Sequence, residues 1–223
     1  MDSRIMEGVD GIRAWADFLA DLAEASAAPA APVRTRTPAG GDPFDHLIDG
    51  LIGREGGYVN HPDDRGGETI WGITVQTARR FGYAGAMRSM SRAEAVRIYR
   101  AQYWDGPDFA AVAAQSVPIA EELFDTGVNM GPAVAAQFLQ RALNALNRQG
   151  KDFRDVKVDG DIGPATMEAL GAFLRLRGAD GETVMLKGLN VLQGARYIDL
   201  AESRPANESF VYGWLRTRIE IPA

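Results

Sequence analysis

A single glutamate, Glu55, stands between an apolar run and a pair of glycines in the stretch "GREGG". If the helical spacing of Phe44 and Ile48 continues, Glu55 falls on the same apolar face, at the C-terminal end of the helix. Burial and the negative end of the helix dipole both disfavour the carboxylate anion there, so we expect a raised pKa. A carboxyl group of this kind can act as a general acid near neutral pH. A glutamate that pairs with Arg54 and merely closes the helix fits the same position.

Two aspartates, Asp63 and Asp64, follow Glu55 in the turn-forming stretch "HPDDRGG". Its proline, arginine and glycines keep the stretch near solvent, so we expect at least one aspartate to stay ionised. Two carboxylates in contrasting environments suit glycoside hydrolysis, in which one protonates the leaving group and the other activates water or stabilises a cationic transition state. Thr69 comes five residues after Asp64 and is a candidate for holding that water. The same residues also form ordinary turns, so the prediction of glycoside hydrolysis depends mainly on the glutamate that precedes them.

The composition argues against several other kinds of site. The 223 residues include no cysteine, so there is no disulfide, thiolate metal site or cysteine nucleophile. A two-histidine zinc centre would need both His46 and His61, and we expect neither a metal nor a cofactor. The net charge of −6 argues against broad nucleic-acid binding. The sequence has no apolar run long enough for stable membrane insertion.

The elements that must position these side chains are mainly helices. Asp42 and Pro43 predict a helix start, and Ser91 with Glu94 forms a capping box for another helix. Residues 58–74 predict a small β-hairpin beside the first helix, with "HPDDRGG" as its turn. We therefore expect a mainly α fold with one small β element. Further helices are predicted over residues 119–129, 132–147, 164–177, 182–202 and 208–219.

The N-terminal residues predict a separate appendage. Residues 1–25 contain an amphipathic helix from about Asp10, and residues 26–41 form an Ala/Pro-rich linker. The first helix is expected either to dock on a partner or to remain a loosely attached surface helix. Acidic residues run through this segment, which therefore does not resemble a secretory signal. We expect synthesis in the cytoplasm without a signal peptide.

Aromatic side chains offer candidate sugar contacts, because a pyranose ring has an apolar C–H face. Tyr58 and Trp71 are the preferred candidates, since both lie close to Glu55 in the sequence. The weaker candidates are Tyr103, Trp104 and Trp214. On the helix over residues 119–129, we expect the acidic residues Glu121, Glu122 and Asp125 to be solvated or capping charges.

The stretch "REGGYVNHPDDRGGETIWGIT" resembles the signature of glycoside hydrolase family 108, phage and bacterial N-acetylmuramidases that include endolysins and muramidases accompanying toxin secretion. The resemblance runs from about Phe44 to the C-terminus. It implies a helical lysozyme-like fold with Glu55 as the catalytic acid. The order Glu, Asp, Thr also resembles the T-even phage lysozymes, although the gap from Asp to Thr is one residue shorter here. Either Asp64 or Asp63 can therefore take the second role.

The distal half carries the resemblance further. The stretch "ELFDTGVNMGPAVAAQFLQRALN" is similar to a second stretch of the family, in which a helix carrying Asn129 faces the cleft. The stretch "VDGDIGPATMEAL" resembles peptidoglycan-binding repeats, although Asp159 and Asp161 also suit a turn and a helix cap before Pro164. The segment through "FVYGWLRTRI" looks like the family's predicted peptidoglycan-binding segment. These similarities imply a muramidase region over 42–128 and a helical peptidoglycan-binding region over 129–223 packed with it.

The expected function is that of a monomeric peptidoglycan hydrolase that cleaves the β-1,4 bond between N-acetylmuramic acid and N-acetylglucosamine in glycan strands. It would act as an endolysin or in wall remodelling for export, reaching the periplasm or the outside through a holin or a secretion system. Glu55, Asp64 and Thr69 are the catalytic candidates, and Tyr58, Asp63, Trp71 and Asn129 the substrate-binding ones. The alternatives are a lytic transglycosylase using Glu55 alone and a non-catalytic wall-binding module. The aspartates and Thr69 favour hydrolysis, and an intact Glu55 disfavours a pure binder.

Overall fold

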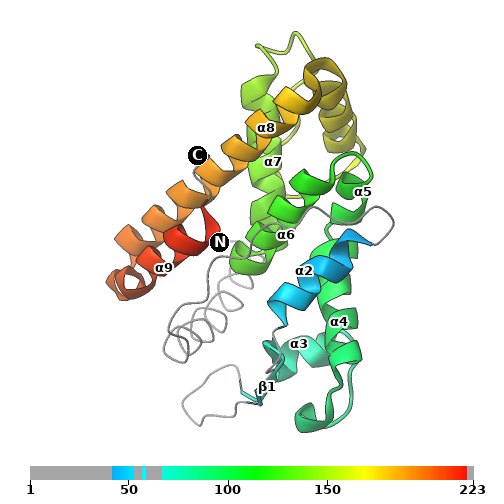
Figure 1. The fold of residues 1–223 in the computed structure, drawn as a ribbon, viewed down its shortest axis with the longest axis vertical. Helices are drawn as coiled ribbons and strands as arrows, with labels where there is room; N and C mark the ends of the chain where they lie inside the picture. The colour runs from blue at the N-terminus through cyan, green and yellow to red at the C-terminus, as the bar shows by residue number, and fades with distance from the viewer. Residues whose placement is uncertain (1–41, 53–56, 59–66, 220–223) are drawn as a thin grey trace. The chain divides into compact units, whose positions relative to one another are not determined.

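The structure is a computed structural model that describes residues 42–52, 57–58 and 67–219 of the chain. The predicted N-terminal helix and linker, Glu55, and the aspartates Asp63 and Asp64 lie outside the described residues. The chain divides into two compact units, Met1–Gly106 and Pro107–Ala223. Figure 1 shows the elements of both units, which are treated one at a time below.

The first unit begins with helix α2, Pro43–Leu51, in the position that the sequence predicted. Asp42 is its N-cap, and one carboxylate oxygen accepts a hydrogen bond of 3.0 Å from the backbone N–H of Phe44. The other oxygen forms an ion pair of 2.7 Å with Arg100. The side chains of Phe44 and Ile48 are buried, so α2 is fixed by its cap at one end and by its apolar face.

A small antiparallel hairpin follows, formed by β1, Thr69–Ile70, and β2, Ile73–Thr74. Thr69 pairs with Thr74, and the two residues between the strands, Trp71 and Gly72, both have positive φ angles of 55° and 74°. Two such residues form the type I′ turn that suits the twist of a two-residue hairpin. The turn therefore lies at Trp71–Gly72, whereas the sequence placed a turn at "HPDDRGG", most of which lies outside the described residues.

Short helical elements complete the first unit. They are α3 (Val75–Arg80), the 3₁₀ turn η1 (Met87–Ser89), α4 (Arg92–Arg100) and the π-helical turn η2 (Ala101–Asp105). The capping box of α4 is confirmed, because Ser91 and Glu94 make both of its reciprocal hydrogen bonds. The sequence did not predict the π turn. It brings Trp104 into the core, where the indole lies against the ring of Phe44 with centroids 5.9 Å apart.

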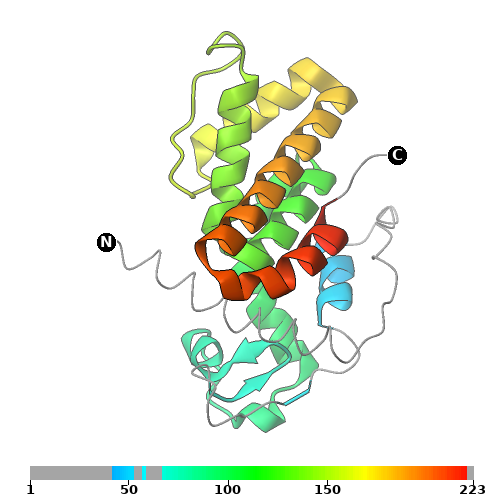
Figure 2. The ribbon, with the colours of Figure 1, turned by 90° about the vertical axis from the view of Figure 1, so that its left-hand side faces the viewer.

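The second unit is a helical bundle. Its elements are α5 (Phe109–Ala113), α6 (Val117–Met130), α7 (Pro132–Leu146), α8 (Pro164–Ser203), η3 (Pro205–Asn207) and α9 (Glu208–Arg218). Helix α6 packs against α5, α7 and α8, so it is the central element of this unit. Figures 1 and 2 show α6, α7 and the second half of α8 side by side, with α9 turned back along α8.

Helix α8 is two helices joined at Gly178, whose backbone is non-helical with φ 57° and ψ −150°. This conformation is open to glycine at little cost and disfavoured for other residues. The break matches the predicted separation of helices over residues 164–177 and 182–202. The fold class, mainly α with a small β-hairpin, is likewise confirmed. Within the described part of the chain, no helix has the length and apolar character needed to cross a membrane.

Candidate active site

Tyr58 is held from two sides in the first unit. Its hydroxyl donates a hydrogen bond of 2.7 Å to the carboxylate of Glu68, and the guanidinium of Arg88 lies 4.1 Å from the centre of its ring. The side chain is half-buried. The sequence reasoning did not select Glu68 or Arg88, although Glu68 directly precedes Thr69 at the start of the hairpin. These contacts fix the orientation of a predicted sugar-binding ring and cover one of its faces.

Trp71, the other predicted sugar contact, occupies the hairpin turn with a left-handed backbone that is uncommon for a non-glycine residue. Its indole N–H donates to the carbonyl of Met90 at 2.9 Å, and its carbonyl accepts from the hydroxyl of Tyr99 at 3.1 Å. Burial, with a smaller contribution from neighbouring Tyr103, raises the pKa of Tyr99, so its hydroxyl remains a donor across the ordinary pH range. The strained turn is therefore fixed by two long-range hydrogen bonds.

Thr69 begins the strand that leads to this turn. Its side chain is half-buried, and its hydroxyl donates to the carbonyl of Gly67 at 3.4 Å, which is long for such a bond. The backbone carbonyl of Glu68 accepts a hydrogen bond of 2.8 Å from Val75, which ties the hairpin to α3. Three candidate residues, Tyr58, Thr69 and Trp71, thus belong to one short region of the first unit.

The helix before Glu55 is shorter than the sequence suggested. We predicted that the apolar face of this helix continues to Glu55, but α2 ends at Leu51 with Ile52 as its C-cap. The backbone N–H of Ile52 still bonds to the carbonyl of Ile48 at 2.9 Å, and its side chain is buried. The prediction of a dipole-raised pKa required the longer helix. Glu55 itself lies outside the described residues, and its raised pKa stays a prediction.

Asn129 and the acidic residues of α6 belong to the second unit. The side-chain amide of Asn129 donates to the carbonyl of Asp125 at 2.7 Å, one turn back on its own helix. Asp125 forms an ion pair with Arg218 and accepts a hydrogen bond of 3.1 Å from Gln193. Glu122 is buried, with 1% of its surface exposed, so the prediction of a solvated or capping charge is wrong for this residue. The reason is the central position of α6, which buries residues on several of its faces.

The Asp159-Gly-Asp161 segment is a turn held by one buried glutamine, as its turn-forming residues predicted. The side-chain carbonyl of Gln140 accepts from the backbone N–H groups of Asp159 and Gly160, each at 3.0 Å. Its amide donates to the carboxylate of Asp159 and to the carbonyl of Asp161, each at 2.9 Å. Gly160 has a φ of 82°, and an added Cβ would lie 2.9 Å from the carbonyl oxygen of Ala133. The motif therefore has a structural role in this chain.

The predicted aromatic candidates outside the hairpin make contacts within the protein. Trp104 is a core residue, and Tyr103 stacks on Tyr99 with centroids 5.7 Å apart, with burial raising its pKa to about 12. Trp214 lies against Tyr197 at 5.3 Å. Among the described residues, no three His, Asp or Glu side chains converge in a way that would hold a metal ion.

Comparisons with known proteins agree with this architecture. Residues 48–131 match the family described as glycosyl hydrolase 108, and residues 134–219 match the family described as predicted peptidoglycan domain. A comparison with curated proteins finds no match. Among solved structures, "Structure of Brucella abortus SagA" is similar, with 24% identity, a TM-score of 0.51, and coverage of 79% of this chain and 96% of that one. That likeness concerns the fold.

The two matched families follow each other along most of the described chain. The segment matched by the first family contains Glu55, Asp63, Asp64 and Thr69. The segment matched by the second family contains most of α7 together with α8 and α9. The order of a glycosidase segment and a peptidoglycan segment assigns the cell wall as the target. The chain therefore contains a glycosyl hydrolase 108 segment followed by a peptidoglycan segment, and it is a peptidoglycan hydrolase of the lysozyme, or N-acetylmuramidase, type.

Proposed function

We propose that Glu55 is the general acid of this hydrolase, and that Asp64, or Asp63 in its place, is the second carboxylate and works with Thr69. The supporting observation is that all of them lie within the segment matched as glycosyl hydrolase 108, with the three carboxylates between helix α2 and the β1–β2 hairpin and Thr69 as the first residue of β1. The bond to be cleaved is the β-1,4 linkage from N-acetylmuramic acid to N-acetylglucosamine.

The proposed reaction transfers two protons. Glu55 donates a proton to the glycosidic oxygen as the bond from that oxygen to the anomeric carbon breaks, and positive charge develops on the sugar ring. The aspartate accepts a proton from a water molecule whose oxygen attacks the anomeric carbon. The products are a reducing muramic end and a free hydroxyl on the leaving sugar. The weak hydrogen bond of Thr69 to Gly67 leaves its hydroxyl able to turn toward this water.

The remaining candidates are proposed to bind sugars. Arg88 covers one face of Tyr58, so we assign the other face of the ring to the glycan. The indole N–H of Trp71 donates to the carbonyl of Met90. The half-buried face of the ring is then assigned to contact with a sugar C–H face. Asp63 and Asn129 are proposed as polar contacts. The side-chain oxygen of Asn129 accepts no hydrogen bond from the described residues.

The acid role is tested by replacing Glu55 with glutamine, which has the same shape but no proton to donate. We expect Glu55→Gln to lower turnover on purified cell walls by 100-fold or more, because general acid catalysis typically contributes that much. Asp63→Asn and Asp64→Asn, made separately, identify the second carboxylate by the larger loss. Asp45→Asn, on the exposed side of α2, is the control and should leave activity near that of the unmodified protein. Retention of more than about a tenth of the turnover by a folded Glu55→Gln protein would contradict the acid role.

The stereochemistry of the product tests the role of the aspartate. A water molecule between two carboxylates requires a separation of roughly 6.5 to 9.5 Å and inverts the anomeric configuration, whereas a direct nucleophile requires about 5 to 5.5 Å and retains it. A carboxylate on a glycine-rich turn beyond the helix end suits the wider separation. Proton NMR of the first product, read before mutarotation, should therefore show the α-anomer. A β-anomer would indicate retention and would reduce the aspartate to a supporting charge.

We also propose that the protein acts as an endolysin or in wall remodelling for export, with residues 1–41 serving delivery or partner docking. The support is the amphipathic pattern and Ala/Pro-rich linker of that segment. Delivery through a holin or a secretion system would bring the enzyme to the wall. Deletion of residues 1–41 should leave activity on isolated walls intact and remove activity only where delivery is required. Loss of activity on isolated walls would place the segment in the catalytic region.

A further inference from the structure

The second unit contains an open hollow of about 650 Å³ at the end of α7 and the loop that follows it. It lies within the segment matched as predicted peptidoglycan domain. Asn147 on its floor is 1% exposed, whereas Gln149 and Arg154 at its edge are exposed. Its lining residues are Asn144, Ala145, Asn147, Gln149, Gly150, Arg154 and Asp155.

The floor of the hollow is preformed by two asparagines. Asn144 binds the backbone of Val156 twice, donating to its carbonyl and accepting from its N–H, each at 2.8 Å. Asn147 accepts from the backbone N–H of Gly150 at 3.0 Å and donates to the carboxylate of Asp155. These side chains hold the loop on the helix through hydrogen bonds within the protein. Because the loop is already ordered, a ligand that binds there does not have to pay the entropy cost of ordering it, which favours affinity.

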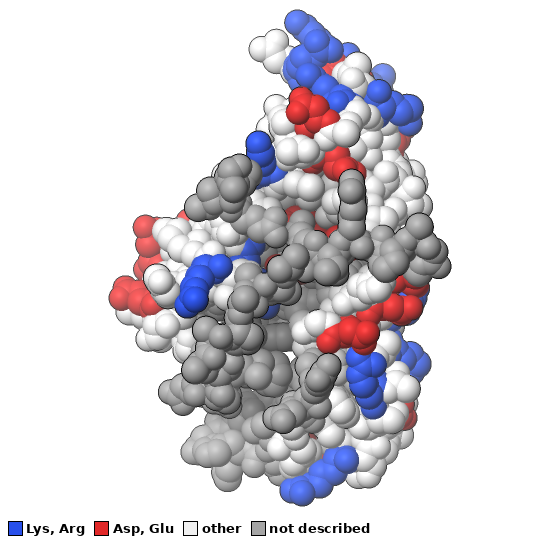
Figure 3. Space-filling model, viewed as in Figure 1, with Lys and Arg blue, Asp and Glu red and all other residues white. Residues whose placement is uncertain are grey.

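Arg154, which lines the hollow, and the nearby cations of the α7–α8 loop and of α8 differ in whether they are already paired. Arg148 and Arg177 both bind the buried carboxylate of Asp152, and hydrogen bonds from Arg148 in particular hold the pKa of Asp152 below its ordinary value. Lys151 and Arg154, by contrast, form no ion pair with the described residues. Figure 3 shows that Lys and Arg side chains gather over the end of this unit, where the α7–α8 loop and the first half of α8 meet.

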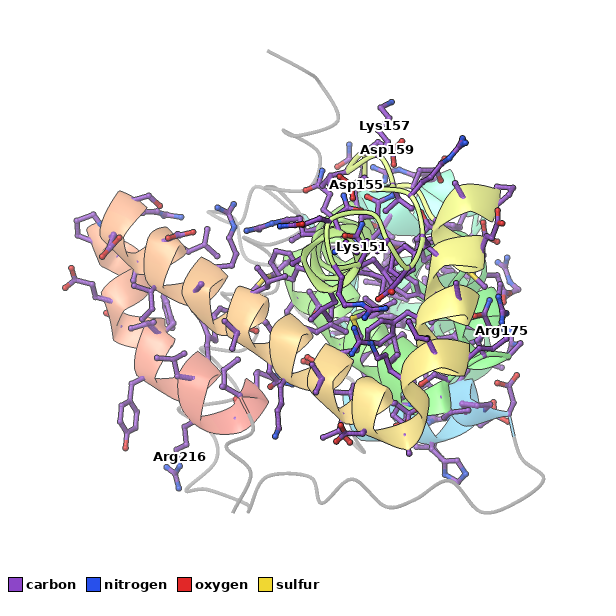
Figure 4. The ribbon with its side chains drawn as sticks, turned by 90° about the horizontal axis from the view of Figure 1, so that it is seen from above. Lys151, Asp155, Lys157, Asp159, Arg175 and Arg216 are labelled. Atoms are coloured by element: carbon purple, nitrogen blue, oxygen red, sulfur yellow. The ribbon has the colours of Figure 1, made fainter. Side chains whose placement is uncertain are left out.

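The arrangement of charges indicates the chemistry of a ligand. Figure 4 shows Lys151 and Asp155 on the same loop, while Arg216 lies on α9, away from it. A guanidinium and an ammonium recognise carboxylates, and Asp155 with the amide of Gln149 suits amide N–H and amino groups. In a peptide-bearing strand the sugars carry no free carboxylate for these cations, because the lactyl carboxyl group of N-acetylmuramic acid is bound in an amide to the peptide. The peptide stems of peptidoglycan carry both carboxylates and amide or amino groups.

We propose that this hollow binds the carboxylate-bearing peptide stem of peptidoglycan, with Arg154 as the main contact and Lys151 in support. The proposal rests on peptidoglycan as the substrate and places stem recognition in the second unit. The enzyme would then hold the wall through its peptides while the first unit acts on the glycan. A net charge of −6 makes nonspecific attraction to an anionic wall unfavourable, so local cations must supply this recognition.

The test compares two soluble wall fragments in titrations followed by NMR chemical shifts, using the full chain. One fragment is the N-acetylglucosaminyl-N-acetylmuramic acid disaccharide with its tetrapeptide, and the other is the same disaccharide without the peptide and with its lactyl carboxyl group capped as a simple amide, so that it carries no charge. Neither contains the bond that a muramidase cleaves, so binding is measured independently of catalysis. We expect the peptide-bearing fragment to bind at least about tenfold more tightly, as one charge-assisted hydrogen bond would give.

Single substitutions locate the site. Arg154→Ala should weaken binding of the peptide-bearing fragment about tenfold and leave the peptide-free fragment unchanged, with a smaller loss for Lys151→Ala. Arg216→Ala, which removes an exposed arginine far from the hollow, is the matched control and should have no effect. Equal binding of both fragments, or equal losses in Arg154→Ala and Arg216→Ala, would overturn the proposal. Stem binding that persists in a Glu55→Gln protein without lysis would separate this site from the proposed catalytic roles.

Discussion

The β1–β2 hairpin of the first unit and the α6–α8 bundle of the second are stabilised by different interactions. The hairpin has two residues in each strand, and its strained turn depends on hydrogen bonds from Tyr99 and to Met90. The bundle buries large apolar side chains along whole helices, among them Leu123, Leu139 and Phe173. Apolar burial is nondirectional and tolerates small shifts, whereas hydrogen bonds fix one geometry. The hydrogen bonds of the hairpin therefore fix the positions of Thr69 and Trp71 more narrowly than apolar packing would.

The largest expected effect is on the bundle. Leu139 is completely buried on α7, so Leu139→Ala should lower the free energy of unfolding by about 2 to 5 kcal/mol, through lost transfer energy and the cavity left behind. The control Leu176→Ala removes a side chain that is 53% exposed and should cost within about 0.5 kcal/mol. Urea unfolding of both proteins measures the difference. Similar losses for both would mean that burial is not what holds the bundle.

A smaller effect is expected where the bundle uses hydrogen bonds. Gln140→Leu keeps the side chain's approximate size but removes the partners of Asp159 and Gly160, and should cost about 1 to 3 kcal/mol. Gln115→Leu, which removes an exposed hydrogen bond to the carbonyl of Met167, should cost within about 0.5 kcal/mol. Hydrogen exchange at residues 159–161 should accelerate in Gln140→Leu alone. Unchanged exchange there would show that Gln140 does not hold the turn.

The smallest effect on stability is expected at the hairpin, together with a larger one on activity. Tyr99→Phe removes the hydroxyl that binds the Trp71 carbonyl and should cost about 1 kcal/mol. Because that bond fixes the turn, wall hydrolysis should fall by more than the change in stability explains. Tyr103→Phe is the control, since its hydroxyl makes no hydrogen bond with the described residues. Full activity in Tyr99→Phe would mean that the position of the turn is unimportant for catalysis.

Helix boundaries with local chemical signals were predictable from the sequence. Asp42 before Pro43, and the box of Ser91 and Glu94, act on the backbone within a few residues, so pattern and outcome agree. The small hairpin was predicted as an element, but its turn at Trp71–Gly72 was not predicted. Trp71–Gly72 is an unusual turn pair because a tryptophan rarely adopts positive φ, and the contacts that stabilise it come from residues 90 and 99.

Contacts between residues far apart in the sequence were not predictable, because no local pattern marks them. Glu68 and Arg88 have no special signal in the sequence, yet they orient Tyr58 from 10 and 30 positions away. Glu122 was predicted to be a solvated or capping charge, but the packing of α6 against α5, α7 and α8 buries it. The roles of Glu55, Asp63, Asp64, Thr69 and Asn129 rest on the residues and the matched families, and they stay predictions.

The π turn η2 contains one residue more than a regular helical turn would at this point of the chain. The backbone N–H of Gly106 bonds to the carbonyl of Ala101, five residues back, at 3.1 Å. Each residue of an α-helix rotates by roughly 100°, and the extra one therefore turns Trp104 toward Phe44. A single-residue deletion before Trp104 would restore a regular helix and yet remove the indole from the core. A chain with one residue fewer here would have to fill that space with a side chain from another position.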